Sequence, residues 1–451
     1  MINKIKNKLS KDIHLFELLK GASISLIFQV FGILLGYVFI FLLSKYYGAE
    51  GMGIFSLSFA LLNIFVLFGK FGLDTATVKL TSEYSSVNEI SGIKDIYFKI
   101  LIIMIPINIV LTFLLFFLAP YIADNIFNKP YLSIYFQIIA FGILPMSLRF
   151  LNANNLRAIK YISSYSFLQS ISLYLIASIL LLFSVFFMEK SLNTVLYIIV
   201  ISLFIGMIIS FIIWFKNSHI LTKNRKEVIS IKNILKISTP MLIASSIMLI
   251  MSWSDTIMLG IFRTEAEVGV YNIAYKISAI VLLIFMAIST ISAPKLASSY
   301  GNNNMSEFKK IAFKSTKLIF IFSLPIFLFI IIFHNFLLGL FGKEFLLGAW
   351  TLIFLVSGQL IKSIFGTLDY ILQMSNQQKP LMIYALTSAI INVLLNYIFI
   401  PIYGIEGAAI ASMISIFIYQ SLLLLKVKKE FGFYLFINIK KLFTKRINIE
   451  F

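Results

Sequence analysis

Charged residues inside apolar segments are the first candidates for chemistry in this 451-residue sequence. Asp255 and Lys276 lie in two successive apolar segments, and Asn272 stands one helical turn before Lys276. Isolated charges in an apolar environment are costly, so we expect them to pair or to face water. If residues 263–268 join two antiparallel helices, both charges lie roughly 10 Å from the connection and can form an ion pair. The pair is either a permanent structural contact or an exchangeable one in which the freed Asp255 accepts a proton.

Two further cations and two amides form a second set of candidates. Arg149 and Lys362 lie near the ends of apolar segments in different halves of the chain. Both can bind an anion, or they can extend to the phosphates of surrounding lipid. Asn392 and Asn396 are one helical turn apart and offer hydrogen bonds either to a polar ligand or between helices.

The composition indicates a membrane protein. Hydrophobic residues make up 60% of the chain and charged residues 13%, whereas soluble domains have about 45–50% and about 25%. A soluble fold would have to bury this apolar surface, but a bilayer covers it. The sequence contains no cysteine, which excludes disulfides and thiolate metal sites.

The hydropathy pattern predicts an all-α integral membrane protein with about 12 transmembrane helices. Each apolar segment is long enough to cross about 30 Å of hydrocarbon, where only a helix or a closed barrel satisfies the backbone. The predicted spans are residues 21–44, 53–71, 100–119, 134–151, 164–188, 195–215, 239–262, 269–293, 315–335, 347–367, 381–401 and 404–425.

The distribution of basic residues predicts the orientation of these spans. Of the 38 Lys and Arg residues, 31 fall on the side of the two termini and 5 in the opposite segments. The 31 include Lys70, Arg149 and Lys317, which lie at the adjoining ends of spans. The positive-inside rule therefore places both termini in the cytoplasm. The net charge of +19 reflects this topology and attraction to an anionic inner leaflet, so we do not expect a nucleic-acid partner.

A long internal repeat divides the chain into two lobes. Residues 53–84 align with residues 269–300 without a gap, which matches Lys79 with Lys295 and Tyr84 with Tyr300. We predict one six-helix lobe at residues 1–222 and a second at 223–451. Because six spans are an even number, the repeats run parallel and face each other across a central cleft. This arrangement predicts alternating access, with a duplicated structural or channel scaffold as the alternative.

Enzyme chemistry is not expected. The three histidines, His14, His219 and His334, lie in different segments, and the sequence contains no HExxH, P-loop or dinucleotide motif. We therefore predict no catalytic residues, no metal and no cofactor. A membrane-embedded glycan polymerase or ligase is the chief enzyme alternative, but the predicted outer segments are too short for an external catalytic domain.

Two segments carry a family resemblance. The run GAEGMGIF at residues 48–55 resembles the start of the second helix in Wzx-type polysaccharide flippases, which handle O-antigen and capsule repeat units. The runs NVLLN at 392–396 and PIYGIEG at 401–407 resemble the eleventh-to-twelfth helix signature of that family. Asp255, shortly before residues 269–271, also fits its pattern. The family belongs to the multidrug/oligosaccharidyl-lipid/polysaccharide exporter superfamily.

The resemblance implies a transporter that moves undecaprenyl-diphosphate-linked oligosaccharide from the inner to the outer leaflet of the bacterial cytoplasmic membrane. Arg149, Lys276 and Lys362 would then bind the diphosphate, the amides would contact sugar, and Asp255 would couple transport to protons or sodium. We expect a monomer that works beside polysaccharide assembly proteins. The candidate substrate-binding amides are Asn272, Asn392 and Asn396.

A multidrug/cation antiporter and a lipid II flippase of the same superfamily are the alternatives. In the multidrug exporters a first-helix acid commonly serves cation coupling, whereas residues 21–44 contain no acid. Lipid II flippases usually have fourteen spans rather than twelve. Both differences favour the polysaccharide flippase.

Overall fold

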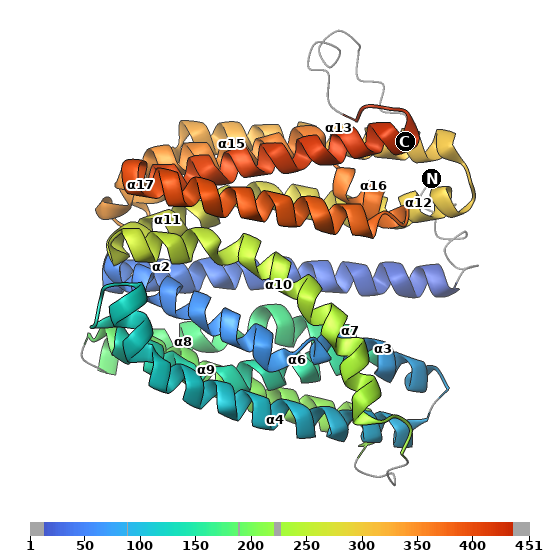
Figure 1. The fold of residues 1–451 in the computed structure, drawn as a ribbon, viewed down its shortest axis with the longest axis horizontal. Coiled ribbons are helices and arrows are strands. Elements are labelled where there is room, and N and C mark those ends of the chain that lie inside the picture. Colours follow the sequence, from blue (N-terminus) through green and yellow to red (C-terminus); the bar gives the residue numbers. More distant parts are fainter. Residues whose placement is uncertain (1–12, 88, 188–189, 221–226, 436–451) are drawn as a thin grey trace. The chain divides into compact units, whose positions relative to one another are not determined.

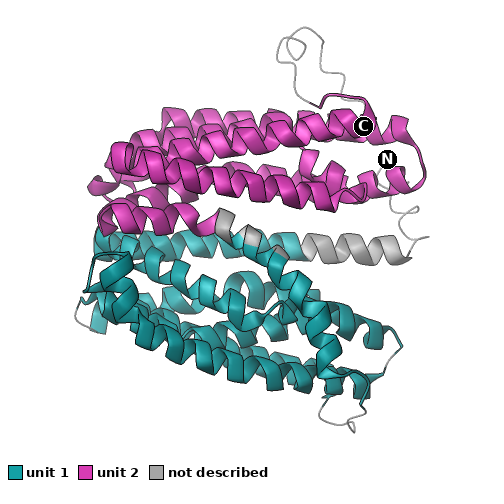
Figure 2. Cartoon of the chain, viewed as in Figure 1, with its two compact units in different colours: residues 1–249 teal, residues 250–451 magenta. Residues whose placement is uncertain are grey.

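The computed structural model describes residues 13–87, 89–187, 190–220 and 227–435. These residues form helices joined by short connections and contain no β-strand (Figure 1). They divide into two compact units, unit 1 (Met1–Leu249) and unit 2 (Ile250–Phe451) (Figure 2). The predicted lobe boundary at residue 222 precedes this division, which falls inside a helix. The basic head before residue 13 and the basic tail after residue 435 lie outside the described residues.

The described residues of unit 1 form eight α-helices and two π-helical turns, followed by the first part of a ninth α-helix. Their bounds are α2 (Ile13–Lys70), α3 (Leu73–Ser86), α4 (Ile90–Tyr121), η1 (Ile122–Ile126), α5 (Leu132–Ala140), α6 (Ile143–Ala158), α7 (Ile162–Ser166), η2 (Phe167–Ile171), α8 (Ser172–Phe187), α9 (Leu192–Ser218) and α10 (Ile231–Phe262). One hydrophobic core joins α3, α4, α6, α9 and the start of α10, with the fully buried Trp214 and Tyr97 at its centre.

Unit 2 begins inside α10 and continues to the end of the described chain. Its elements are α11 (Glu265–Ser278), α12 (Ile280–Gly301), α13 (Met305–Ile332), α14 (His334–Gly339), η4 (Lys343–Gly348), α15 (Ala349–Phe365), α16 (Leu368–Met374) and α17 (Gln378–Phe431). A core cluster around Leu296, Phe308 and Leu423 joins α12, α13, α16 and α17.

Two glycines turn long helices back on themselves. Gly48 has φ 69° and ψ −168° inside α2, and Gly404 has φ 62° and ψ −134° inside α17. A residue with a Cβ rarely adopts these backbone angles, so glycine permits the reversals. The ring of Phe39 then packs 5.4 Å from that of Phe55 across the α2 turn. Figure 1 shows the two parts of α2, and those of α17, running back beside each other.

Nine helical segments of the described chain are long and apolar enough to cross a membrane. The segments of α2 and α17 each contain two antiparallel parts, so these nine hold eleven crossings. Helix α10 covers the predicted span 239–262 and would be the twelfth, so the count of twelve stays a prediction. The multi-pass, all-α membrane fold is confirmed.

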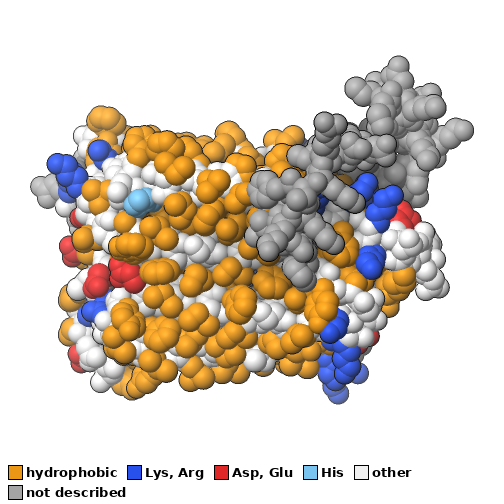
Figure 3. All heavy atoms as spheres, turned by 90° about the horizontal axis from the view of Figure 1, so that it is seen from above, with side chains coloured by type: hydrophobic (Ala, Val, Ile, Leu, Met, Phe, Trp, Pro, Cys, Tyr) orange, Lys and Arg blue, Asp and Glu red, His pale blue; other side chains and the backbone are white. Residues whose placement is uncertain are grey.

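The outside of the protein is suited to lipid. Large apolar side chains are exposed along the spans, among them Phe117 at 72% and Phe186 at 76%. Figure 3 shows hydrophobic side chains across the middle of the face that it draws, with Lys and Arg gathered towards its two ends. This is the pattern that a bilayer flanked by water and headgroups favours.

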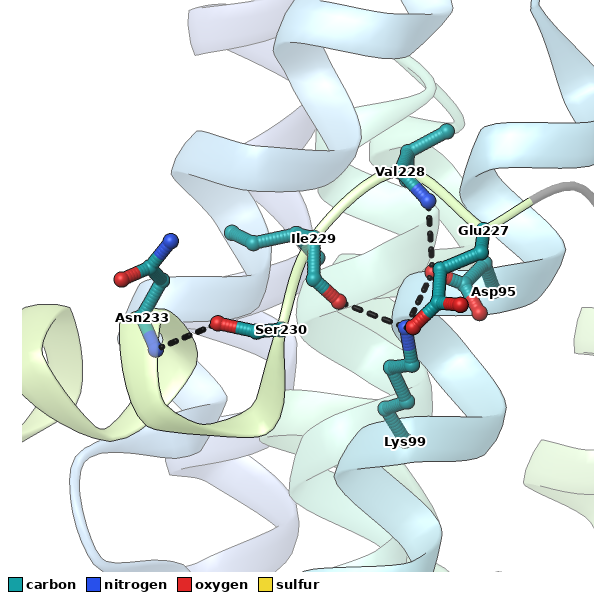
Figure 4. Close-up of polar contacts among 7 residues, drawn as sticks. All are labelled: Asp95, Lys99, Glu227, Val228, Ile229, Ser230 and Asn233. Atoms are coloured by element: carbon teal, nitrogen blue, oxygen red, sulfur yellow. Dashed lines mark hydrogen bonds and ion pairs between the residues drawn. The ribbon is translucent and has the colours of Figure 1, made fainter.

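A polar contact set fixes the segment that leads into α10. The Lys99 ammonium of α4 bonds Asp95 Oδ2 at 2.9 Å, Glu227 Oε1 at 3.0 Å and the Ile229 carbonyl at 2.6 Å (Figure 4). The Val228 amide donates to the same Asp95 oxygen at 3.0 Å. Asp95 is fully buried, so this clasp compensates its charge and anchors residues 227–229 to α4.

Candidate functional site

The half-buried carboxylate of Asp255 is the centre of a polar cluster in unit 2. Its Oδ2 accepts hydrogen bonds from the hydroxyls of Tyr271 and Ser412, both at 2.5 Å. Its Oδ1 accepts a hydrogen bond from Asn396 Nδ2 at 2.6 Å. Three helices supply the four side chains: α10 carries Asp255, α11 carries Tyr271, and the two parts of α17 carry Asn396 and Ser412. A carboxylate in an apolar span is therefore held by neutral donors.

A second layer of amides and hydroxyls supports the first. Asn392 Oδ1 accepts hydrogen bonds from Ser254 at 2.8 Å and from Asn396 Nδ2 at 3.1 Å, while Asn392 Nδ2 donates to Ser412 at 3.3 Å. Asn396 Oδ1 is buried and has no hydrogen-bond partner among the described residues. We call Ser254, Asp255, Tyr271, Asn392, Asn396 and Ser412 the Asp255 cluster. Within the described chain, the cluster thus contains one buried acceptor whose hydrogen-bonding capacity is unused.

The register between α10 and α11 decides which side chains meet. Helix α11 starts at Glu265 and is separated from the end of α10 by two residues, whereas the hydropathy pattern predicts a start at residue 269. Tyr271 is therefore six residues into α11, and Asp255 is seven residues before the end of α10. At 1.5 Å per residue the two lie at the same depth. Thr256 and Asn272 confirm this register, because the Thr256 hydroxyl donates to Asn272 Oδ1 at 3.4 Å.

The predicted ion pair between Asp255 and Lys276 is wrong for this structure. All the hydrogen bonds of Asp255 within the described chain run to Tyr271, Asn396 and Ser412. Lys276 is eleven residues into α11, whereas Asp255 is seven residues before the end of α10, so Lys276 lies about 6 Å deeper than Asp255. Because α11 starts earlier than predicted, Lys276 lies more than one helical turn beyond the level of Asp255. Tyr271 lies opposite Asp255 instead.

The ends of these helices are fixed by a cap and an arginine. Thr264 and Glu267 form a capping box at the start of α11, with hydrogen bonds of 3.0 and 3.3 Å between side chains and backbone. The Arg263 guanidinium donates to the carbonyls of Ile400 and Pro401 at 2.8 to 3.1 Å. The reversal at Gly404 leaves these carbonyls without helical partners, so Arg263 satisfies them and ties α10 to α17.

Arg149 is buried in unit 1 on α6, with 3% of its surface exposed. Its Nη1 donates to the Leu168 carbonyl at 2.6 Å and to Ser172 Oγ at 3.1 Å. Both partners belong to the π-helical turn η2 and the residue after it, and π-turns are frequent at functional sites. Arg149 Nε has no partner, and no carboxylate of the described residues forms an ion pair with this guanidinium. In the described chain, one carbonyl, one hydroxyl and the Phe150 ring, whose centre is 5.0 Å from Arg149 Cζ, contact this charge.

Lys362 lies in the last turn of α15 in unit 2. Its ammonium stands 4.7 Å from the centre of the Phe285 ring, and that ring packs 5.8 Å from Tyr370. Cation–π attraction holds the charge over the aromatic face. The structure therefore brings Asp255, Asn392 and Asn396 into one cluster, with Asn272 beside it, whereas Lys362 has other partners and Arg149 belongs to unit 1.

Several polar residues that form hydrogen bonds inside the two units were not predicted from the sequence. Tyr271 and Ser412 bond Asp255 directly, but a tyrosine and a serine in apolar segments give no distinctive signal. In unit 1, Asn155 Oδ1 accepts hydrogen bonds from Thr77 and Thr81, and Asn152 bonds Tyr97 and Ser210. The helical spacing of Asn152 and Asn155 with Arg149 could have shown that α6 carries one polar face.

A family model described as "Polysaccharide biosynthesis protein" matches residues 18–300 of the chain. That match covers more than half of the sequence. The chain belongs to the polysaccharide biosynthesis protein family. A second model, MatE, matches residues 240–398, which include Asp255 and both asparagines of the Asp255 cluster. The resemblance inferred from the sequence is confirmed, and so is membership of the exporter superfamily.

Two curated relatives of this family member come from Haloferax volcanii. The chain is 29% identical over 165 residues to the protein named "Probable low-salt glycan biosynthesis flippase Agl15". It is 27% identical over 167 residues to "Probable flippase AglR". In each case the match covers 36% of this chain and 35% of the relative, so it spans about a third of either protein.

Solved structures share the fold of this family member. An inward-facing multidrug resistance MATE transporter of the MOP superfamily has a TM-score of 0.76 at 14% identity, covering 91% of this chain and 98% of the other. The lipid II flippase MurJ in an inward closed conformation has a TM-score of 0.71 at 20% identity, covering 90% and 88%. At these identities the likeness shows a common fold.

The Asp255 cluster contains oxygen ligands and a single acid. Among the described residues, no group of three His, Cys, Asp or Glu side chains converges as a transition-metal site would require. The carboxylate of Asp255 and the free Asn396 Oδ1 are instead suited to a proton or a hard cation, which prefers carboxylate and carbonyl oxygens. In this family member the cluster is a candidate ion site.

Proposed function

We propose that the protein flips undecaprenyl-diphosphate-linked oligosaccharide from the inner to the outer leaflet of the bacterial cytoplasmic membrane. The observation that carries the proposal is the family match, which accompanies an all-helical fold over the described residues. The two Haloferax relatives, named as a probable glycan biosynthesis flippase and a probable flippase, support the same activity. Alternating access between two lobes would expose the substrate first to the cytoplasm and then to the exterior.

The cations of the two units suit an anionic headgroup. Arg149 carries a buried charge with one unbonded N–H, and Lys362 carries a half-buried ammonium over an aromatic ring. A diphosphate cannot enter hydrocarbon without such partners. We assign Arg149, on α6, and Lys362, in the last turn of α15, to a diphosphate that enters from the cytoplasmic side. The distribution of Lys and Arg in the sequence predicts that the C-terminal ends of both helices face that side. Lys276, which does not lie opposite Asp255, is a third candidate for binding the diphosphate.

Asp255 is the proposed coupling residue. Protonation of its carboxylate, or binding of a sodium ion between Asp255 and Asn396 Oδ1, would remove a charge from the span. The hydroxyls of Tyr271 and Ser412 would then have to reorient, because each now donates to the ionised oxygen. Since these donors lie on α11 and α17, a change of the bound ion would act on the packing of three helices. No enzymatic step is part of this function.

The multidrug/cation antiporter is the runner-up, because MATE transporters share the fold. A lipid II flippase is the second alternative for the same reason. Residues 21–44 contain no acid, which is the feature that disfavours the multidrug activity. The three activities differ in substrate, so they can be separated in cells.

The decisive experiment deletes the gene and restores it with the wild-type or the Asp255→Asn sequence. Loss of surface glycan with unchanged drug sensitivity, restored only by the wild-type sequence, is the expected result. Raised drug sensitivity with normal glycan would support the antiporter. Arrest of cell-wall synthesis with accumulation of lipid II would support the lipid II flippase. Either of the last two results overturns the proposal.

A further inference from the structure

Six exposed lysines gather at one end of unit 2. They are Lys309, Lys310, Lys314 and Lys317 on the first turns of α13, and Lys428 and Lys429 at the end of α17. We call these six residues the basic end. Within the described chain, no carboxylate forms an ion pair with any of them. Figure 1 shows the start of α13 and the end of α17 at the same end of the unit.

The acids nearest in sequence are already engaged elsewhere. Glu307 closes the N-terminus of α13, where its amide donates to Asn304 Oδ1 at 3.1 Å and its side chain accepts from Asn304 Nδ2 at 3.2 Å. Glu430 pairs with Lys426. Within the described chain, no acid therefore compensates the six charges of the basic end.

Aromatic contacts fix the two helix ends into one surface. The Phe308 and Phe431 rings pack at 5.4 Å, so α13 and α17 touch at this point. After the turn at Gly432, the chain folds over both helices, and Leu435 is fully buried. The Lys309 ammonium lies 5.4 Å from the Phe433 ring, and the Lys428 ammonium lies 4.4 Å from the Tyr434 ring. Two lysines from different helices are thus held over adjacent rings.

The repeat shows that the fold does not require this charge. Residues 72–99 of unit 1 correspond to residues 288–315 of unit 2, and α4 and α13 each follow a three-residue connection. The unit 1 segment contains three lysines and four acids, and Lys99 is paired with two of the unit's carboxylates. The unit 2 segment contains four lysines and one acid. The same structural element is therefore stable with or without an excess of lysine.

The apolar surface next to the basic end indicates its partner. Phe313, Leu318 and Phe322 follow along α13 and are 38%, 42% and 54% exposed. Lysines that pass directly into exposed apolar side chains match the boundary between headgroups and acyl chains, where Lys and Arg bind anionic lipid. A protein or nucleic-acid partner would not need the exposed phenylalanines below the charges.

We propose that the basic end binds the headgroups of anionic phospholipids in the membrane leaflet that it faces. The interaction goes beyond the proposed transport activity and does not depend on it. It would hold α13 and α17 together through their shared lipid. Because the lysines are exposed, the attraction should weaken as salt rises.

The test uses the full chain in nanodiscs and compares phosphatidylglycerol with phosphatidylcholine. The variant carries Lys310→Gln, Lys314→Gln, Lys428→Gln and Lys429→Gln. The matched control loses four exposed lysines of unit 1, with Lys79→Gln, Lys216→Gln, Lys232→Gln and Lys236→Gln. Lipid binding is measured by native mass spectrometry, and the melting temperature in phosphatidylcholine checks that each variant is folded.

We expect the wild type to retain phosphatidylglycerol about tenfold more tightly than the basic-end variant, and the control to stay near the wild type. Equal losses in variant and control would reduce the effect to overall charge and overturn the proposal. Competition by inorganic pyrophosphate at equal concentration would identify a soluble-phosphate site instead, which also overturns it. Binding of phosphatidylglycerol by the folded variant at wild-type strength is the third contradicting result.

Discussion

Tyr271 donates its hydroxyl to Asp255 at 2.5 Å, so a tyrosine of α11 occupies the place where a lysine was expected. The two residues lie at equal depth on neighbouring helices. Tyr271 is 2% exposed, and its ring stacks 6.5 Å from that of Tyr275. Asp255 is thus hydrogen-bonded to a buried aromatic side chain. A change in the charge of Asp255 would alter this bond and therefore the packing between α10 and α11.

Replacing Tyr271 by Phe should lower the stability of unit 2 against unfolding and should impair transport. The change removes one of three donors to a charged group, which costs about 1.5–3 kcal/mol in the free energy of unfolding. Glycan export and thermal unfolding of the purified protein measure the two effects. Tyr275→Phe is the control, because the Tyr275 hydroxyl makes no hydrogen bond in the described chain. Equal effects of both changes would show that the hydroxyl of Tyr271 is not special.

Exchanging the two charges should not rescue the protein. Asp255→Lys combined with Lys276→Asp would preserve an ion pair if these residues were in contact. In the structure, Asp255 is bonded by Tyr271, Asn396 and Ser412, so a lysine at position 255 would face hydroxyl and amide donors. We expect the double variant to export no more glycan than Asp255→Asn. Recovery of export in the double variant would show that residues 255 and 276 do form a direct ion pair.

Arg149 should be needed for transport but not for stability. Its buried charge has no carboxylate partner in the described chain, and apolar replacement of buried charges is often neutral or stabilising by about 1–4 kcal/mol. Arg149→Met is therefore expected to keep or raise the melting temperature while abolishing glycan export. Arg157→Met is the control, since Arg157 is exposed and lies over Tyr165. Normal export by the Arg149 variant would remove this residue from the proposed diphosphate site.

Gly404→Ala should disturb the α17 reversal. The new Cβ would be strained at φ 62°, and residues held in such regions cost on the order of 1–3 kcal/mol. Displacement of the turn would also separate Arg263 from the carbonyls of Ile400 and Pro401. Thermal unfolding measures the loss. Gly301→Ala is the matched control, because no heavy atom lies within 4 Å of the added Cβ and the change should be neutral. A neutral Gly404→Ala would show that the turn tolerates a side chain.

Lys99→Ala should destabilise unit 1 by leaving the Asp95 carboxylate buried. Asp95 is 0% exposed, and removing one partner of a buried pair costs about 3–5 kcal/mol. The second carboxylate, that of Glu227, is 82% exposed and adds little. Limited proteolysis between α9 and α10 should also accelerate, because the clasp in Figure 4 holds residues 227–229. Lys79→Ala, at an exposed position, should change neither stability nor cleavage. Unchanged proteolysis of the Lys99 variant would show that the clasp does not hold this segment.

The sequence alone determined the class of the protein. Its apolar segments predicted a multi-pass helical protein. The hydrophobicity of a segment is a local property, and a segment inside a bilayer must satisfy its backbone hydrogen bonds within itself. It also singled out Asp255, Asn392 and Asn396, since polar groups are rare in spans and therefore visible. The resemblance carried by residues 48–55 and 392–407 led to the right family because glycines at reversals are constrained by the backbone itself.

Only the tertiary structure decided which polar side chains meet. The start of α11, four residues earlier than predicted, rotated Lys276 away from Asp255 and brought Tyr271 to it. Helix ends depend on capping by Thr264 and Glu267, which hydropathy does not detect. Ser412 and Asn396 reach Asp255 through the reversal of α17, so their contact requires two helices in one geometry. The hydrogen-bond partners of Asp255 are determined by how three helices pack, and such packing leaves no local pattern in the sequence.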